Sequence, residues 1–270
     1  MNSPIQLVIP AAGAGSRFRE TGVTTPKPLI EIAGIPMILW VLSNFSLKRD
    51  DTVVIVSQLA DELPIKLQNY LDSLLFKVTF VEIQGLTSGP ASTVQIALAK
   101  LNLNLPVIVA NSDQYVSADL SLFLDSVRSQ KNPGLILTMK ASGDKWSYVG
   151  RDPNGIIDNV IEKVQISNEA TVGIYAWSNS SLLHDALNYL KESKALVNNE
   201  YYVAPSYNYL IQKKLFIESM SVGGHGDSVH GLGTPEDLRQ FLNHPHFDEF
   251  SEKVQLFLKT IPTINRESPS

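Results

Sequence analysis

Short apolar runs alternate with longer amphipathic segments through the first half of the chain. The apolar runs are rich in β-branched residues and bounded by polar or turn-forming residues, which predicts strands at residues 5–11, 52–56, 78–83, 106–110 and 134–139. The segments between them have helical spacing and lie near residues 37–45, 59–75, 90–100 and 120–127. Because strands that alternate with helices build βαβ units, we expect an α/β fold with a mostly parallel sheet flanked by helices.

The pattern changes after Ala141. A strong turn sequence at residues 152–155, Asp-Pro-Asn-Gly, separates two short apolar segments at 148–150 and 156–162. This arrangement predicts an antiparallel hairpin. A further strand over 171–177 precedes a helix whose apolar face carries Leu182, Leu183, Ala186, Leu187 and Leu190. The second half is therefore expected to be mixed rather than parallel.

The last part of the chain is predicted to be helical. Thr234 offers a capping hydroxyl immediately before Pro235 and two acidic residues, a well-formed helix start. Residues 206–212 and 247–258 also have helical spacing, and residues 262–270 are expected to be a loose tail.

No segment is rich enough in Gly, Pro or Ser to separate two independent domains. We therefore expect a single domain over residues 1–245, made of a parallel half (1–140) and a mixed half (141–245). A C-terminal helix and tail would occupy residues 246–270.

Composition excludes several classes of function. The 270 residues carry a formal charge of −5 and no cysteine, so disulfide scaffolds, thiolate zinc sites and cysteine nucleophiles are excluded. The acidic balance argues against nucleic acid or an anionic membrane as a partner. No apolar run approaches the ~18–20 residues of a membrane span. We expect a soluble, cytoplasmic protein whose partners are small molecules.

A run of small residues follows the first predicted strand directly, as Ala11-Ala12-Gly13-Ala14-Gly15-Ser16-Arg17. Small residues let backbone N–H groups approach an anion, and the carboxyl ends of parallel strands are where open α/β sheets bind ligands. Phe18 stands where the dinucleotide fingerprint needs its third glycine, and the Gly-Lys-Ser/Thr sequence of ATPase phosphate loops is absent. A tight turn without a ligand is the alternative interpretation.

A lysine held between two prolines favours a phosphate ligand, because the fixed φ of each ring stiffens the chain around Lys27. With the loop above, two further segments resemble the signature of the sugar-phosphate nucleotidyltransferase family, the nucleotide-sugar pyrophosphorylases: Pro26-Lys27-Pro28-Leu29 and Gly34-Ile35-Pro36-Met37-Ile38. The similarity extends over about residues 5–243. It implies a Rossmann-like sheet of the glycosyltransferase-A type, with a nucleotide-binding first half and an acceptor-binding second half.

The resemblance also implies the activity and the site. Such enzymes join a nucleoside triphosphate to a phosphorylated sugar or alcohol and release pyrophosphate. Catalytic cations would be Arg17 and Lys27, and Asp113 would bind Mg²⁺. The nucleotide would contact Ala11, Ala12, Gly13, Ala14, Gly15, Ser16, Gln84, Gly89, Ala91 and Ser112. The acceptor would contact Glu162, Lys163, Gly173, Tyr175 and Glu200.

One departure from the family concerns the metal. Many relatives have an aspartate two residues before the Gly-Thr pair, where this chain has Gly231. Either Asp113 holds the metal with water and phosphates alone, or a neighbour such as Asp227 or His230 substitutes. A metal trio of His225 with these two residues is a further alternative.

The Asn-Ser-Asp-Gln sequence at 111–114 and the Asn-Glu-Tyr-Tyr sequence at 199–202 are most similar to a subgroup linked to surface-polysaccharide precursors. Two rival functions stay open. A glycosyltransferase of the same fold would use a finished nucleotide sugar, but its Asp-x-Asp motif is missing because position 111 is Asn. A non-catalytic nucleotide-sensing subunit is the second rival. The sequence leaves open the nucleobase, the acceptor and whether the chain forms a homo-oligomer.

Overall fold

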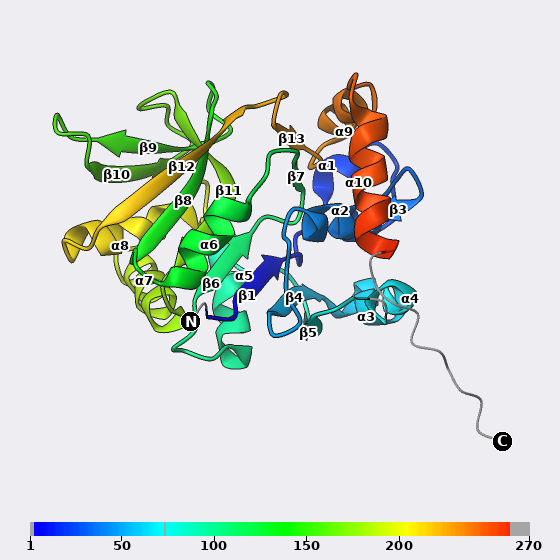
Figure 1. Cartoon of the computed structure of the whole chain (residues 1–270), viewed down its shortest axis with the longest axis horizontal. Helices are drawn as coiled ribbons and strands as arrows, with labels where there is room; N and C mark the ends of the chain where they lie inside the picture. The colour runs from blue at the N-terminus through cyan, green and yellow to red at the C-terminus, as the bar shows by residue number, and fades with distance from the viewer. Residues whose placement is uncertain (1–2, 73, 260–270) are drawn as a thin grey trace.

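A mixed sheet forms the centre of the molecule (Figure 1). The computed structural model describes residues 3–72 and 74–259. The strands of the large sheet are β1 (Gln6–Pro10), β4 (Thr52–Gln58), β5 (Lys77–Ile83), β6 (Val107–Ala110), β8 (Gly134–Lys140), β9 (Ser147–Arg151), β10 (Ile157–Glu162), β11 (Glu169–Trp177) and β12 (Ile217–Gly224). Their order within the described residues is β10-β9-β11-β6-β1-β4-β5, with β8 beside β11 and β12 beside β8.

The remaining elements are short strands and helices. Two small sheets pair β2 (Glu31–Ile32) with β3 (Ile35–Pro36), and β7 (Gln114–Val116) with β13 (Val229–Gly231). The α-helices are α1 (Ser16–Arg19), α2 (Met37–Ser43), α3 (Leu63–Lys66), α4 (Gln68–Leu71), α5 (Pro90–Ala97), α6 (Ser121–Ser129), α7 (Ser180–Glu192), α8 (Tyr207–Gln212), α9 (Pro235–Leu242) and α10 (Phe247–Lys259). Short 3-10 turns lie at Lys27–Leu29, Leu59–Asp61, Leu98–Lys100 and Ala204–Ser206.

Helices cover both faces of the sheet, which confirms the predicted α/β class. Strands β1, β4, β5 and β6 are parallel to their neighbours within this group. Because successive strand residues point to opposite faces, Leu7 and Ile9 join the apolar cluster of α2, α6 and α10, whereas Val8 joins the cluster of α5 and α7. Every residue of α2 except the last is buried. The two clusters fix the sheet between two helical layers.

The large sheet becomes antiparallel at β11, which confirms the mixed second half that the sequence predicts. β11 pairs antiparallel with β6, β8 and β9, and β9 and β10 form the predicted hairpin. The register of β11 against β8 shifts between Thr171 and Tyr175, where Gly173 has a φ of +84°. This bulge faces the end of β6 and so bends the strand at the edge of the site described below.

Several predicted elements differ from the structure. The helix expected over 59–75 is broken into a 3-10 turn, α3 and α4, because Glu62 adopts a left-handed φ of 53° that ends the first turn before the next begins. Strand β12 and the four short strands were not expected from the pattern. The predicted tail at 262–270 lies outside the described residues, and the domain limits 1–245 stay a prediction.

Candidate functional site

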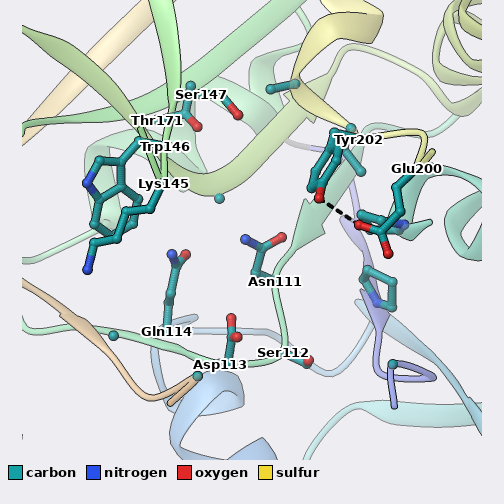
Figure 2. A pocket seen from close by; sticks show the side chains of 18 of the residues that line it. Asn111, Ser112, Asp113, Gln114, Lys145, Trp146, Ser147, Thr171, Glu200 and Tyr202 are labelled. Carbon is teal, nitrogen blue, oxygen red and sulfur yellow. Dashed lines mark hydrogen bonds between the residues drawn. The ribbon is translucent and has the colours of Figure 1, made fainter. Parts of the chain in front are cut away.

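A cavity of about 580 Å³ opens at the carboxyl ends of β1 and β6, between the parallel and the mixed halves (Figure 2). Twelve of the predicted site residues line it, and they come from segments far apart in the sequence: Ala11, Gly13, Gly15, Arg17, Lys27, Ser112, Asp113, Glu162, Lys163, Gly173, Tyr175 and Glu200. The fold thus brings the predicted phosphate, metal and acceptor residues to one place.

The glycine-rich loop forms one wall of the cavity. The Ala11 N–H donates to Val56 O at 2.8 Å, which ties the loop to the end of β4. Gly15 has a φ of +61°, and a side chain there would lie 3.3 Å from Cβ of Lys27. The loop therefore packs directly against Lys27, which lies between two prolines. A Cβ at Gly13 would meet nothing within 4 Å, so the backbone there is open to a ligand.

Lys27 and Asp113 form an ion pair across the floor of the cavity, with side chains 20% and 25% exposed. Lys27 begins the 3-10 turn that its flanking prolines stabilise, and Asp113 follows β6. A side chain at Gly233 would lie 2.4 Å from Oδ2 of Asp113, and Leu232 N–H donates to Asp113 O at 2.8 Å. The absence of a side chain at Gly233 therefore leaves room for the Asp113 carboxylate beside the segment before α9.

The donor set at Asp113 suits Mg²⁺ that is held mainly by phosphates and water. Mg²⁺ is commonly bound through one or two carboxylates together with substrate phosphates and several waters, and Asp113 offers one such carboxylate at the cavity floor. Within the described residues, no group of three or more His, Asp or Glu side chains could hold a metal ion.

The histidine alternatives for the metal have other surroundings. His230 is 4% exposed and packs against Tyr115, Phe241 and Phe250. Burial lowers the pKa of His230 to about 4, so its imidazole is neutral near pH 7. Asp227 is exposed and accepts a hydrogen bond from the Ser228 hydroxyl. The described residues therefore do not form the His–Asp–His trio that the sequence left open.

The opposite wall of the cavity carries the predicted acceptor residues. Burial raises the pKa of Glu162, although its hydrogen bond from the Ser147 hydroxyl acts in the lowering direction. Lys163 has a left-handed φ of 58°, and its ammonium group lies over the Tyr202 ring at 4.4 Å from the centroid. The Tyr202 hydroxyl donates to Glu200 at 2.6 Å (Figure 2). A carboxyl, a cation and a second carboxylate therefore face the cavity from two segments, 162–163 and 200–202.

The bulge at Gly173 lets β11 approach the end of β6 very closely. A Cβ at Gly173 would lie 2.3 Å from Nδ2 of Asn111 and 2.5 Å from Oε1 of Gln114, and Asn111 N–H donates to Gly173 O at 2.9 Å. Behind it, the Tyr175 hydroxyl is hydrogen-bonded to Thr171 at 2.9 Å, and Tyr175 is only 4% exposed. Gly173 therefore serves the close packing of two amides at the cavity floor.

Sequence reasoning did not select several residues that line the cavity. Gln114 is 8% exposed, and its buried Oε1 atom has no hydrogen-bond partner among the described residues. Asn111 lies beside it (Figure 2). Tyr202, Lys145 and Trp146 line the opposite part. The four-residue sequence at 111–114 was a usable signal for the two amides, but no local pattern pointed to Lys145 or Trp146.

The remaining predicted nucleotide residues lie outside the cavity lining. Gln58 donates to Ala12 O at 2.8 Å and to Gly85 O at 2.9 Å, so the glycine-rich loop and the end of β5 are joined beside Gln84. Gln84 itself is exposed. The other four predicted residues border these segments: Ala14 and Ser16 in the loop, and Gly89 and Ala91 at the start of α5. Their assigned contacts with a nucleotide stay predictions.

A glycine-rich wall, Arg17 and the ion pair of Lys27 with Asp113 share one cavity in an α/β protein, at the ends of parallel strands, where open α/β sheets bind ligands. Comparison with known sequences gives the family. The model of the nucleotidyl transferase family matches residues 6–217, and the chain belongs to that family. This confirms the resemblance found in the sequence.

Curated relatives agree with this family. The chain is 32% identical over 184 residues to a mannose-1-phosphate guanylyltransferase catalytic subunit beta of Drosophila pseudoobscura pseudoobscura, covering 65% of this chain and 48% of that protein. It is 29% identical over 188 residues to a mannose-1-phosphate guanyltransferase of Schizosaccharomyces pombe, covering 66% and 51%. The chain therefore spans about half the length of the curated relatives it matches.

Solved structures share the fold. A nucleoside-diphosphate-sugar pyrophosphorylase from Vibrio cholerae RC9 has a TM-score of 0.73 at 24% identity, covering 87% of this chain and 99% of that one. An inositol-1-phosphate CTP transferase from T. maritima has a TM-score of 0.70 at 14% identity, covering 94% and 98%. None of the helices in the described part of the chain is long and apolar enough to cross a membrane.

Proposed function

We propose that this chain is a Mg²⁺-dependent nucleotidyltransferase that joins a nucleoside triphosphate to a phosphorylated sugar or related metabolite and releases pyrophosphate. One observation carries the proposal: the glycine-rich loop, Lys27 and Asp113 share a single cavity with Glu162, Lys163 and the segment at 200–202. The cavity therefore has one end suited to a triphosphate and another suited to a phosphorylated acceptor. We further propose a cytoplasmic role in making precursors of surface polysaccharide.

In the proposed reaction, an oxygen of the acceptor phosphate attacks the α-phosphorus of the triphosphate. The bond from this phosphorus to the oxygen that bridges to the β-phosphate breaks, and pyrophosphate leaves with that electron pair. Catalysis of such transfers consists largely of positioning and charge stabilisation. A bound Mg²⁺ would neutralise charge on the phosphate oxygens.

Local cations must overcome the net charge of −5. Arg17 offers a planar fork to phosphate oxygens, and Lys27 offers a compact charge at the cavity floor. Arg17 also acts electrostatically on Tyr202, lowering a pKa that burial and Glu200 raise, so its charge reaches the acceptor end. Lys163 would bind the acceptor phosphate, while Glu200 would accept hydrogen bonds from acceptor hydroxyls.

The proposal is tested by pyrophosphate release. The purified chain is incubated with each of GTP, CTP, UTP and dTTP against a set of phosphorylated acceptors that includes mannose 1-phosphate, glucose 1-phosphate and phosphocholine, with and without Mg²⁺. Acceptor-dependent release of pyrophosphate that requires Mg²⁺ is expected for at least one combination. Transfer from a finished nucleotide sugar without pyrophosphate would instead identify the glycosyltransferase alternative, and binding without turnover would favour a sensing subunit.

A further inference from the structure

The ammonium group of Lys163 makes its polar contacts with one side chain, that of Tyr202. It donates a hydrogen bond to the Tyr202 hydroxyl and lies 4.4 Å from the centroid of the ring. A cation above an aromatic face is attracted by the quadrupole of the ring. Within residues 3–72 and 74–259, no carboxylate oxygen lies within 4.0 Å of this ammonium group. Among these residues, Lys163 is therefore a cavity cation held by a phenol rather than by an anion.

The Tyr202 hydroxyl joins this cation to a carboxylate. It donates to Oε2 of Glu200 at 2.6 Å (Figure 2), and it accepts from Lys163. A phenol has one proton to donate and lone pairs that accept, so it can make both bonds at once. Burial and the Glu200 carboxylate raise the pKa of Tyr202, which keeps the hydroxyl protonated at neutral pH. One oxygen atom thus stands between a positive and a negative group.

Two carboxylates lie near Lys163, and they differ in their surroundings. Glu162, the preceding residue, is 6% exposed and accepts a hydrogen bond from the Ser147 hydroxyl. Glu200 is exposed, and its bond from Tyr202 is the only hydrogen bond to its carboxylate among the described residues. An exposed glutamate side chain can change rotamer at little cost, whereas a buried one is held by its packing. Glu200 is therefore the carboxylate that could pair with Lys163 if the hydroxyl were absent.

We propose that Tyr202 is a positioning residue whose hydroxyl keeps Lys163 and Glu200 from forming a direct ion pair. This inference rests on the proposed function, in which Lys163 binds the acceptor phosphate and Glu200 accepts hydrogen bonds from acceptor hydroxyls. A direct pair would occupy both groups, and it would have to break before the acceptor could bind. With the phenol between them, the cation and the carboxylate are both held in place in advance, which lowers the free-energy cost of binding.

Crystal structures of the free protein test this arrangement before the acceptor is known. Tyr202→Phe retains the ring and removes only the hydroxyl oxygen, and Tyr202 is only partly buried, so the change opens no cavity in the core. In this variant we expect Nζ of Lys163 to lie within about 4 Å of a Glu200 carboxylate oxygen, the limit of an ion pair. A Tyr202→Phe structure in which Lys163 and Glu200 remain farther apart than this would overturn the proposal.

Steady-state kinetics test the consequence for binding, with the triphosphate and acceptor that give pyrophosphate in the assay above. Tyr202→Phe should raise KM for the acceptor about fivefold, because an exposed ion pair that must first be broken contributes up to about 1 kcal/mol. KM for the triphosphate should stay at its wild-type value, since Tyr202 contacts Lys163 and Glu200 at the acceptor end. A general loss of structure would instead affect both substrates.

A double-mutant cycle tests whether Glu200 is the competing group. An amide in place of the carboxylate cannot form an ion pair, so Tyr202→Phe should have much less effect on the acceptor KM in a Glu200→Gln background than in the wild type. An equal effect in both backgrounds would mean that the hydroxyl acts on the acceptor by itself, and the proposal would be wrong.

Tyr209→Phe is the matched control. Tyr209 on α8 also lies beneath a lysine, since Nζ of Lys213 is 5.5 Å from its ring centroid, but neither residue lines the cavity. This control should retain the wild-type KM for both substrates. If no combination of triphosphate and acceptor releases pyrophosphate, the proposed function fails, whereas the crystallographic comparison still decides whether Tyr202 separates Lys163 from Glu200.

Discussion

Replacing Lys27 by methionine should separate rate from metal binding. The ammonium group of Lys27 pairs with Asp113 at the cavity floor, where both side chains are about one-quarter exposed or less. At an effective dielectric constant of about 20, a unit cation ~4 Å from a unit negative charge interacts by ~4 kcal/mol. Losing an interaction of this size between Lys27 and a phosphate oxygen in the transition state corresponds to a fall in kcat of about a thousandfold.

The same change should make divalent cations bind more readily. In the wild-type protein a cation at Asp113 must compete with the Lys27 ammonium group, whereas Lys27→Met removes both the competitor and its repulsion. The concentration of Mg²⁺ that gives half-maximal activity should therefore fall while kcat falls. A partly exposed ion pair contributes less than about 1 kcal/mol to folding, so the melting temperature should change by no more than about 4 °C.

The assay is steady-state pyrophosphate release over a range of Mg²⁺ concentrations, with Mn²⁺ binding followed by electron paramagnetic resonance. Lys66→Met is the matched control, because Lys66 pairs with Glu62 at 3.3 Å on an exposed surface and does not line the cavity. Pyrophosphate release by Lys27→Met within tenfold of the wild-type rate would refute the reasoning. An increased requirement for Mg²⁺ would refute the assignment of Asp113 as the competing ligand.

Three further predictions concern the cavity floor, the fold and pH. Gly173→Ala places a Cβ 2.3 Å from Asn111 at a left-handed φ, so it should lower the free energy of unfolding in urea by about 2–4 kcal/mol, whereas Gly155→Ala should cost about 1 kcal/mol. Asp51→Asn leaves the Arg128 guanidinium buried without its partner and should cost about 3–5 kcal/mol in the same measurement. Burial raises the pKa of Glu162, so the native state retains a proton that the unfolded chain releases, and stability falls as the pH rises from about 4.3 through the raised value. Glu162→Gln should reduce that fall, and an unchanged slope in urea unfolding across this pH range would contradict the buried carboxyl.

Local patterns predicted the elements that local physics determines. The predicted helix start at Thr234 is confirmed by its hydroxyl, which accepts from Asp237 N–H at 3.0 Å. The predicted hairpin about residues 152–155 is also confirmed. Its turn was predictable because the hydrogen bonds that close it join residues of the same short segment. Strand β12 was missed because much of it is only partly buried and it ends in two glycines, so it lacks the alternation of a strand with one buried face.

The site was predictable where its residues form contiguous motifs. The loop at 11–17 and the segment at 26–29 could be found because each motif is read from neighbouring positions. In contrast, the contact of Gly173 with Gln114 depends on the antiparallel pairing of β11 with β6, and the contact of Gly89 with Tyr201 joins distant segments. Such contacts arise from tertiary packing, which no local pattern encodes.

The central claim is that the cavity holds the phosphates of a triphosphate. A crystal structure of the chain soaked with a triphosphate and Mg²⁺ tests this most directly. Phosphate oxygens are expected within hydrogen-bonding distance of the backbone at Gly13 and of the side chains of Arg17 and Lys27, with the cation on Asp113. Phosphates bound elsewhere on the molecule, with this cavity empty, would contradict the account.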